Sequence, residues 1–204
     1  MSLVQDFQRK RGILFVVSGP SGVGKDTVLD RALQNMEGII KSVSATTRPP
    51  RDTERSGIDY FFYTQERFET EIADAAFLEY ENYGSHFYGT PLAPVEQSLA
   101  EGTDVVLKIE VKGALNVKQL LPATRLIFIQ PPAFSVLEER LIGRGKDTPE
   151  KIQQRLEIAK GELDARREYH YLITNDNLET AVNTLCAIII AERHRIQPES
   201  SVRI

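Results

Sequence analysis

The sequence Gly19-Pro20-Ser21-Gly22-Val23-Gly24-Lys25 decides the fold, because it separates an apolar run from a segment with helical periodicity. The apolar run is Ile13 to Val17, and the helical pattern covers residues 25–35. Glycines let several backbone N–H groups turn toward one centre, and the N-terminus of the following helix adds a partial positive charge. Lys25 contributes a positive point charge for the outer phosphates of a nucleotide. The stretch therefore predicts a phosphate-binding loop, or P-loop, between a buried strand and a helix.

The rest of the chain mostly repeats this alternation of apolar strand and amphipathic helix. Further buried strands are predicted at residues 105–107, 126–129 and 171–174, and further helices at about 112–121, 134–142, 149–168 and 178–196. Such alternation is typical of a parallel sheet with helices on both faces. We therefore expect an α/β fold of the P-loop NTPase type, in which a parallel sheet is flanked by helices.

Two segments interrupt the alternation. Residues 42–90 contain short aromatic runs, such as Tyr60-Phe61-Phe62-Tyr63, which predict a small, mostly antiparallel insertion. The stretch Gly143-Arg144-Gly145-Lys146-Asp147-Thr148-Pro149 has the composition of a mobile lid. We expect a single domain over residues 1–204, with a core at 12–41, 91–142 and 156–197, the insertion at 42–90 and the lid at 143–155.

Composition excludes several other classes of protein. The 204 residues carry a formal net charge of −4, whereas a general nucleic-acid binder usually has a basic excess. No run approaches the roughly 20 apolar residues of a membrane span, so no membrane contact is expected. The single cysteine, Cys186, rules out an intramolecular disulfide and suits a cytoplasmic protein. The sequence leaves open whether the chain forms a homo-oligomer.

Beyond the loop, a series of segments follows in a fixed order. They are Ser44-Ala45-Thr46-Thr47-Arg48-Pro49-Pro50-Arg51, Phe77-Leu78-Glu79-Tyr80, Tyr88-Gly89-Thr90, Gly143-Arg144-Gly145 and Thr174-Asn175-Asp176. Together with the loop, the series resembles guanylate kinase over about residues 12 to 196. The resemblance implies a transferase that uses ATP and Mg²⁺ to phosphorylate GMP, and also dGMP, in purine nucleotide metabolism. It also implies that residues 42–90 form a GMP-binding subdomain.

The resemblance assigns two groups of residues to GMP. Glu79, with Ser44, Thr90 and Glu110, is expected to face the guanine base, since a carboxylate can accept hydrogen bonds from guanine N1–H and N2–H₂ together. Adenine lacks this pair of donors, so the carboxylate would discriminate between the two bases. The GMP phosphate is expected to contact Arg48, Arg51, Tyr60 and Tyr88.

The donor side is assigned in the same way. The residues expected to contact ATP are Gly19, Pro20, Ser21, Gly22, Val23, Gly24, Lys25, Asp26, Thr27 and Asn175. The residues expected to stabilise charge during phosphoryl transfer are Lys25, Arg48, Arg140, Arg144 and Arg155. Phosphoryl transfer requires positioning and charge stabilisation rather than a covalent nucleophile, so arginines from a closing lid suit the chemistry.

Two positions depart from the family pattern. Asp26 stands where a serine or threonine hydroxyl normally binds Mg²⁺, and Thr27 is rotated by about 100° on a helix and cannot simply replace it. Asp26 can itself ligate Mg²⁺ or repel the nucleotide phosphates. Lys108 replaces an acid on the strand at 105–110. We hypothesise that Asp26 and Lys108 form a compensating ion pair; the alternative is that they vary independently and point apart.

Two other functions remain open. The Gly24-Lys25-Asp26 sequence also resembles the loop of ribose 1,5-bisphosphate phosphokinase, although Glu79 and Thr90 would have no base to recognise in a sugar phosphate. Guanylate-kinase-like scaffold domains keep the fold without catalysis, but the chain retains Lys25 and the lid-side arginines. The resemblance therefore favours an active enzyme.

Overall fold

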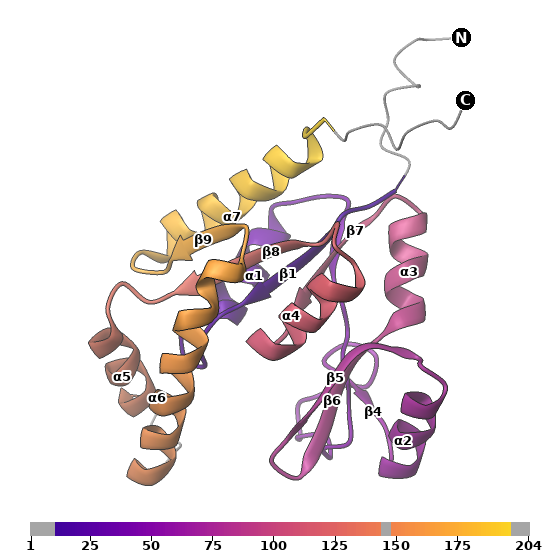
Figure 1. Ribbon diagram of the computed structural model, residues 1–204, viewed down its shortest axis with the longest axis horizontal. Helices are drawn as coiled ribbons and strands as arrows, with labels where there is room; N and C mark the ends of the chain where they lie inside the picture. The colour runs from indigo at the N-terminus through magenta and orange to yellow at the C-terminus, as the bar shows by residue number, and fades with distance from the viewer. Residues whose placement is uncertain (1–10, 144–147, 197–204) are drawn as a thin grey trace.

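The computed structural model describes residues 11–143 and 148–196 and has a parallel five-stranded sheet at its centre (Figure 1). The order of strands is β2-β7-β1-β8-β9. Their bounds are β1 Leu14–Ser18, β2 Ile39–Lys41, β7 Asp104–Lys108, β8 Arg125–Gln130 and β9 Tyr171–Thr174. Because all the strands run the same way, their carboxyl ends meet at one edge, where ligands bind in open α/β sheets. The predicted α/β fold class is confirmed.

Strand β1 lies between β7 and β8 and leads directly into the phosphate loop. Val17 is in register with Lys108 on one side and with Ile127 on the other. The loop that follows β1 therefore begins beside the end of β7, which brings Lys108 close to it.

Helices cover both faces of this sheet (Figure 1). Phe15 and Val17 of β1 pack with α1, α5, α6 and α7, whereas Leu14 and Val16 pack with α3 and α4. The bounds are α1 Lys25–Gln34, α3 Leu92–Ala100, α4 Val111–Leu120, α5 Phe134–Gly143, α6 Pro149–Asp164 and α7 Leu178–Arg193. Burial of β1 on both faces accounts for its unbroken apolar sequence.

A second sheet is inserted between β2 and β7, with strand order β4-β3-β6-β5. The strands are β3 Ala45–Thr46, β4 Phe61–Phe62, β5 Phe77–Tyr83 and β6 His86–Pro91. Two of its three pairings are antiparallel and β3–β4 is parallel. Helix α2 (Gln65–Ala73) packs on it through Phe68, whose ring stacks on Phe77 at 4.3 Å and on Phe87 at 5.4 Å between centroids.

The structure adds elements that the sequence patterns do not predict. These are α2, α3 and the edge strand β2, whose three residues include only one buried side chain, Ile39. The helix predicted over 149–168 ends at Asp164 and is followed by a 3₁₀ turn, η2, at Ala165–Glu168. Within residues 11–143 and 148–196, no helix is long and apolar enough to cross a membrane.

Asp104 joins three distant parts of the chain at the amino end of the sheet. Its fully buried carboxylate accepts a hydrogen bond from the backbone N–H of Ile13 at 2.7 Å and one from Nε of Arg193 at 2.8 Å. Arg193, at the end of α7, also donates to the carbonyl of Glu37 just before β2. A single carboxylate therefore ties the start of β1 to the last helix.

We expect Asp104→Ala to lower the free energy of unfolding by about 3 kcal/mol, because it leaves a buried N–H and an arginine without their acceptor. Urea denaturation measures this change. Glu157→Ala is the control, since Glu157 pairs with Lys160 on the surface of α6 and its loss should cost less than about 1 kcal/mol. Equal effects of the two substitutions would show that Asp104 contributes no more to the free energy of unfolding than a surface charge does.

Candidate active site

The phosphate loop connects β1 to α1, and its shape depends on glycine. Gly19, Gly22 and Gly24 have φ values of 148°, 92° and 95°. A Cβ atom at Gly19 would lie 2.0 Å from the carbonyl oxygen of Ile129, and one at Gly24 would lie 2.7 Å from Nδ2 of Asn175. These positions therefore combine a left-handed backbone with a lack of space, as the sequence predicts for an anion-binding turn.

Two predicted donor-side residues hold the loop from the far side. The Asn175 carboxamide donates to the carbonyl of Val23 at 2.8 Å, and Arg140 donates to the same carbonyl at 3.3 Å. Arg140 also donates to the backbone carbonyl of Asn175 at 3.0 Å. This link from α5 and the end of β9 fixes the carbonyl side of the loop, so that its N–H groups are free to face a ligand.

Lys25 is buried at the base of the loop. Its ammonium group donates to the carbonyl of Gly19 and, at 3.3 Å, to that of Pro20. It also lies 3.9 Å from Oε2 of Glu110. The side chain therefore lies folded against the loop, where an incoming phosphate can replace the carbonyls as its acceptor.

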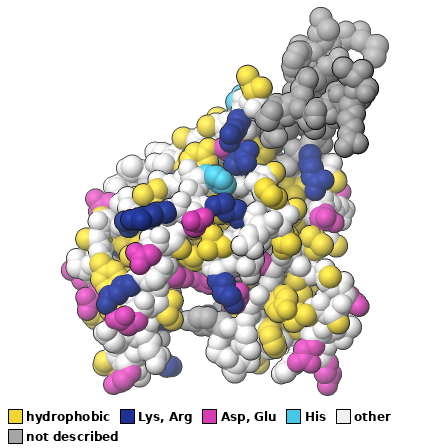
Figure 2. Space-filling view, in the orientation of Figure 1, with side chains coloured by type: hydrophobic (Ala, Val, Ile, Leu, Met, Phe, Trp, Pro, Cys, Tyr) yellow, Lys and Arg dark blue, Asp and Glu magenta, His cyan; other side chains and the backbone are white. Residues whose placement is uncertain are grey.

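A cavity of about 640 Å³ opens beside the loop, between the two sheets. It is lined by side chains from α1, β7, α4 and the inserted sheet. The predicted site residues among them are Asp26, Ser44, Tyr60, Glu79, Tyr88 and Glu110. In the space-filling view, a notch separates the α5–α6 part of the molecule from the inserted sheet (Figure 2). The fold thus brings together six of the predicted residues from segments far apart in the chain.

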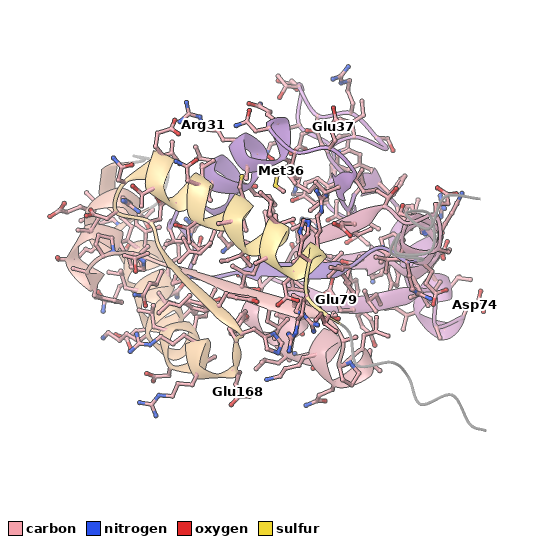
Figure 3. The ribbon with its side chains drawn as sticks, turned by 90° about the horizontal axis from the view of Figure 1, so that it is seen from above. Arg31, Met36, Glu37, Asp74, Glu79 and Glu168 are labelled. Atoms are coloured by element: carbon pink, nitrogen blue, oxygen red, sulfur yellow. The ribbon has the colours of Figure 1, made fainter. Side chains whose placement is uncertain are left out.

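Glu79 is a buried carboxylate in the wall of this cavity. It is 8% exposed and lies in the interior of the molecule, away from the periphery where Asp74 and Glu168 lie (Figure 3). It accepts a hydrogen bond from the Thr90 hydroxyl at 2.6 Å. Burial raises the pKa of its carboxyl, and the Thr90 hydroxyl opposes this rise. Burying such a group is costly unless further donors compensate it, which favours a binding role.

Arg48 and Arg51 share one carboxylate in this structure. Glu54 accepts two hydrogen bonds from Nη2 of Arg48, at 2.8 and 2.9 Å, and lies 4.0 Å from Nη1 of Arg51. The hydrogen bond from Arg48 lowers the pKa of the Glu54 carboxyl. Glu54 is not among the predicted site residues, although its three-residue spacing after Arg51 is a usable signal. The two arginines therefore converge on an anion, as a phosphate clamp requires.

Aromatic residues flank this clamp. Tyr60 and Tyr88 meet edge to face, with ring centroids 6.1 Å apart. The Arg48 guanidinium lies 5.6 Å from the centre of the Tyr60 ring. Arg51, by contrast, is 76% exposed, whereas the Arg48 side chain is 16% exposed; neither arginine is among the described residues that line the cavity. Three of the four residues predicted for the GMP phosphate are thus in mutual contact, and the fourth lies at the rim.

The Lys108 ammonium donates to Oδ1 of Asp26, which confirms the hypothesis of an ion pair. Burial raises the pKa of the Asp26 carboxyl, but the hydrogen bond and charge of Lys108 outweigh it and leave the pKa below its ordinary value. For Lys108 the two effects have the opposite signs. Burial lowers its pKa, but the hydrogen bond and charge of Asp26 outweigh burial, so that the pKa lies above its ordinary value. Both groups are therefore ionised at neutral pH.

The described residues of the site form no preformed cage for a metal ion. In the part of the chain that the structure describes, no group of three or more His, Cys, Asp and Glu side chains is arranged to hold one. Mg²⁺ commonly binds instead through one or two carboxylates together with substrate phosphates and water. The Asp26 carboxylate is 64% exposed even while Lys108 contacts it, so it fits the part of one such ligand.

A second acidic residue, Glu162 of α6, lies beside Glu110 and was missed by the sequence analysis. Burial and the charge of Glu110 raise the pKa of Glu162 to about 7. Both carboxyls border a second cavity, between α4 and α6, that Arg155 also lines. Because α6 has a long polar face, no sequence signal distinguished Glu162 from its solvated neighbours. Arg155 lies on α6, on the wall of this second cavity opposite α4.

The remaining predicted residues lie as follows. Thr27 is exposed on α1, in keeping with its rotation away from the position of Asp26. Ser21 lines the second cavity, and Pro20 is a buried residue of the loop. Arg144 lies outside the described residues, as does most of the loop between α5 and α6.

Known proteins resemble this chain over most of its length. The sequence model of the guanylate kinase family matches residues 11–192. A guanylate kinase of Thermus thermophilus is 50% identical over 185 residues, which cover 91% of this chain and 84% of the relative. A guanylate kinase of Bacillus subtilis is 44% identical over 194 residues, covering 93% of this chain and 95% of the relative.

The fold agrees with these sequence matches. The crystal structure of a guanylate kinase from Anaplasma phagocytophilum superposes with a TM-score of 0.75 and 29% identity. The superposition covers 92% of this chain and 89% of that one. With the loop, the buried carboxylate and the arginine pair already in place, the chain belongs to the guanylate kinase family.

Proposed function

We propose that this protein transfers the γ-phosphoryl group of ATP to GMP, producing ADP and GDP. The observation that carries the proposal is Glu79, a buried carboxylate in the wall of the cavity beside the phosphate loop. A guanine base offers N1–H and N2–H₂ to such an acceptor and satisfies it. A ribose bisphosphate has no such edge, so nothing in the site favours the sugar-phosphate alternative. Deoxy-GMP presents the same edge and is a further expected acceptor.

The GMP-binding subdomain is proposed to be residues 42–90. Glu79 and Thr90, whose side chains are already bonded to each other, would contact the base together with Ser44 and Glu110. Arg48 and Arg51 would exchange the Glu54 carboxylate for the GMP phosphate, with Tyr60 and Tyr88 beside them. This exchange is reasonable because a phosphate dianion is a stronger partner for two arginines than one carboxylate.

The donor nucleotide is proposed to bind through the loop. The backbone N–H groups of Gly19 to Lys25, and the N-terminus of α1, would surround the phosphates of ATP. Lys25 would turn from the Gly19 and Pro20 carbonyls to the outer phosphates. Asp26 and Thr27 follow in the first turn, and Asn175, which supports Val23, would lie near the adenine. Mg²⁺, held by ATP and Asp26, would neutralise charge on the phosphates.

Arginines from α5 and α6 are proposed to stabilise the transferring group. Arg140 lies against the loop, Arg155 borders the cleft, and Arg144 belongs to the proposed lid at residues 143–155. The acceptor is already a phosphate oxygen, so the reaction needs alignment and charge stabilisation rather than a general base. We place the reaction in the cytoplasm, in keeping with a chain that has one cysteine.

A coupled assay of ADP release tests this function. The acceptors are GMP, AMP, CMP, UMP and ribose 1,5-bisphosphate, each measured with ATP over a range of Mg²⁺ concentrations. Turnover restricted to GMP, and to dGMP in a further run, is the expected result. Binding of GMP without turnover would favour the scaffold alternative, and turnover of the sugar phosphate would overturn the assignment of the acceptor.

We expect Glu79→Gln to lower kcat/KM for GMP by roughly 10- to 100-fold, because an amide offers a donor where guanine also has donors. The discrimination between GMP and AMP should fall with it. Glu71→Gln is the control, since Glu71 lies on α2 outside the cavity, where it pairs with Arg67. If Glu79→Gln used GMP as well as the parent does, the assignment of base recognition to Glu79 would be wrong.

We expect Arg51→Met to raise the Kd for GMP about tenfold through loss of one charge-assisted contact, without abolishing ATP binding. Isothermal titration of each nucleotide separately measures both constants. Arg55→Met, an exposed arginine in the same loop, serves as the control. An equal loss of affinity for ATP would place Arg51 on the donor side instead.

A further inference from the structure

Lys108 lies where the phosphate loop and the acceptor cavity meet. It is the last residue of β7 and is in register with Val17, two residues before Gly19. Its side chain is 30% exposed, lines the cavity, and is close enough to Tyr60 for the two groups to interact electrostatically. The ammonium group is therefore near both a proposed phosphate-binding tyrosine and the first turn of α1.

The charges that line this cavity are unbalanced. Among the described residues that line it, seven are acids, namely Asp26, Asp30, Glu54, Asp59, Glu79, Glu81 and Glu110, and three are bases, namely Lys41, Lys108 and Lys112. An acceptor that carries a phosphate dianion needs positive charge there, in addition to any that the arginine clamp supplies. Lys41 pairs with Asp30, and Lys112, which is 76% exposed, pairs with Glu81. Of the three lysines, Lys108 has the least exposed side chain.

The position of Lys108 is fixed by Asp26. This aspartate lies in the first turn of α1, where the positive end of the helix favours a carboxylate. An ammonium group has three donors, so contact with Asp26 leaves two for other acceptors. The ammonium group is therefore held in the lining of the cavity with two N–H donors left to bind a ligand.

We infer that Lys108 binds the phosphate of the acceptor nucleotide, with Asp26 as the residue that positions its ammonium group. The inference rests on the proposed function and adds a residue to it. Lys108 would lie between the acceptor phosphate and the phosphates held by the loop, where two anions must approach each other. It would thus supply, from the protein itself and without a metal ion, part of the positive charge that lets them come together.

Binding measured without metal tests this role. The affinities of GMP and of guanosine are determined by isothermal titration in EDTA, without ATP, and their ratio gives the contribution of the phosphate. In Lys108→Met, this ratio should fall about tenfold, since one charge-assisted hydrogen bond is lost. Guanosine affinity itself should not change. Lys108→Arg should restore most of the ratio, and Lys118→Met, a lysine of similar exposure that pairs with Glu168 outside the cavity, should keep the value of the parent.

A ratio in Lys108→Met equal to that of the parent would overturn the inference, because Lys108 would then only pair with Asp26. That failure is separate from failure of the proposed function. If the parent phosphorylates GMP but the ratio does not depend on Lys108, only the inference falls. If the parent neither binds nor phosphorylates GMP, both fall.

A second variant guards against misfolding of Lys108→Met. The double substitution Asp26→Ser with Lys108→Glu removes the ammonium group but leaves a hydroxyl and a carboxylate that can hydrogen-bond each other. Its GMP-to-guanosine ratio in EDTA should fall at least as far as that of Lys108→Met. A folded double variant, judged by circular dichroism, that retains the ratio of the parent would contradict the role of Lys108.

Discussion

The contact between the phosphate loop and the neighbouring strand β8 is the constraint on which the site depends. At Gly19 there is no space for a side chain, because a Cβ atom would lie 2.0 Å from the carbonyl oxygen of Ile129. Close packing of Gly19 against Ile129 of β8 therefore fixes the start of the loop at the carboxyl edge of the sheet. Arg140 and Asn175 then hold the Val23 carbonyl from behind. A loop fixed on both sides gives its N–H groups one orientation, which is the condition for preorganised binding of phosphate.

The inserted sheet positions Glu79 and Tyr88 in the cavity beside the loop. Pairing of β5 with β6 sets Glu79 directly across from Thr90, and the same ladder places Tyr88 farther along. The aromatic packing of Phe68 against Phe77 and Phe87 keeps this sheet together although β3 and β4 have only two residues each. The acceptor cavity thus owes its shape to a small core that is separate from the main sheet.

Charge in this site is organised in pairs. Glu54 holds Arg48, and Asp26 holds Lys108. Each pair joins a cation that suits a phosphate with an acid that keeps the cation in place while the phosphate is absent. Because the Asp26–Lys108 pair is partly exposed, it contributes little to stability, and its orientation of the ammonium group matters more. When a nucleotide binds, its phosphate would then replace a carboxylate as the partner of a cation that is already in position.

The sequence predicted the main sheet well, because strands buried on both faces leave unbroken apolar runs such as Ile13 to Val17. The sequence did not predict β2, because one buried residue in three produces no recognisable hydrophobic pattern. It also did not predict the short helices α2 and α3, which are close in sequence to aromatic segments with strand-like patterns. The pairing of Asp26 with Lys108 could be anticipated because two departures of opposite sign occurred near one loop. The support of the loop by Arg140 and Asn175 could not, since it depends on backbone carbonyls that the sequence does not reveal. Glu162 was missed for a similar reason: its raised pKa comes from burial and from tertiary proximity to Glu110.

The most direct measurement is a crystal structure with GMP and a non-hydrolysable ATP analogue bound together. The account predicts that the guanine N1 and N2 groups lie within hydrogen-bonding distance of the Glu79 carboxylate. It also predicts that the phosphates of the analogue lie over the loop from Gly19 to Lys25. Density for the guanine base away from Glu79, with the cavity between the two sheets empty, would contradict it.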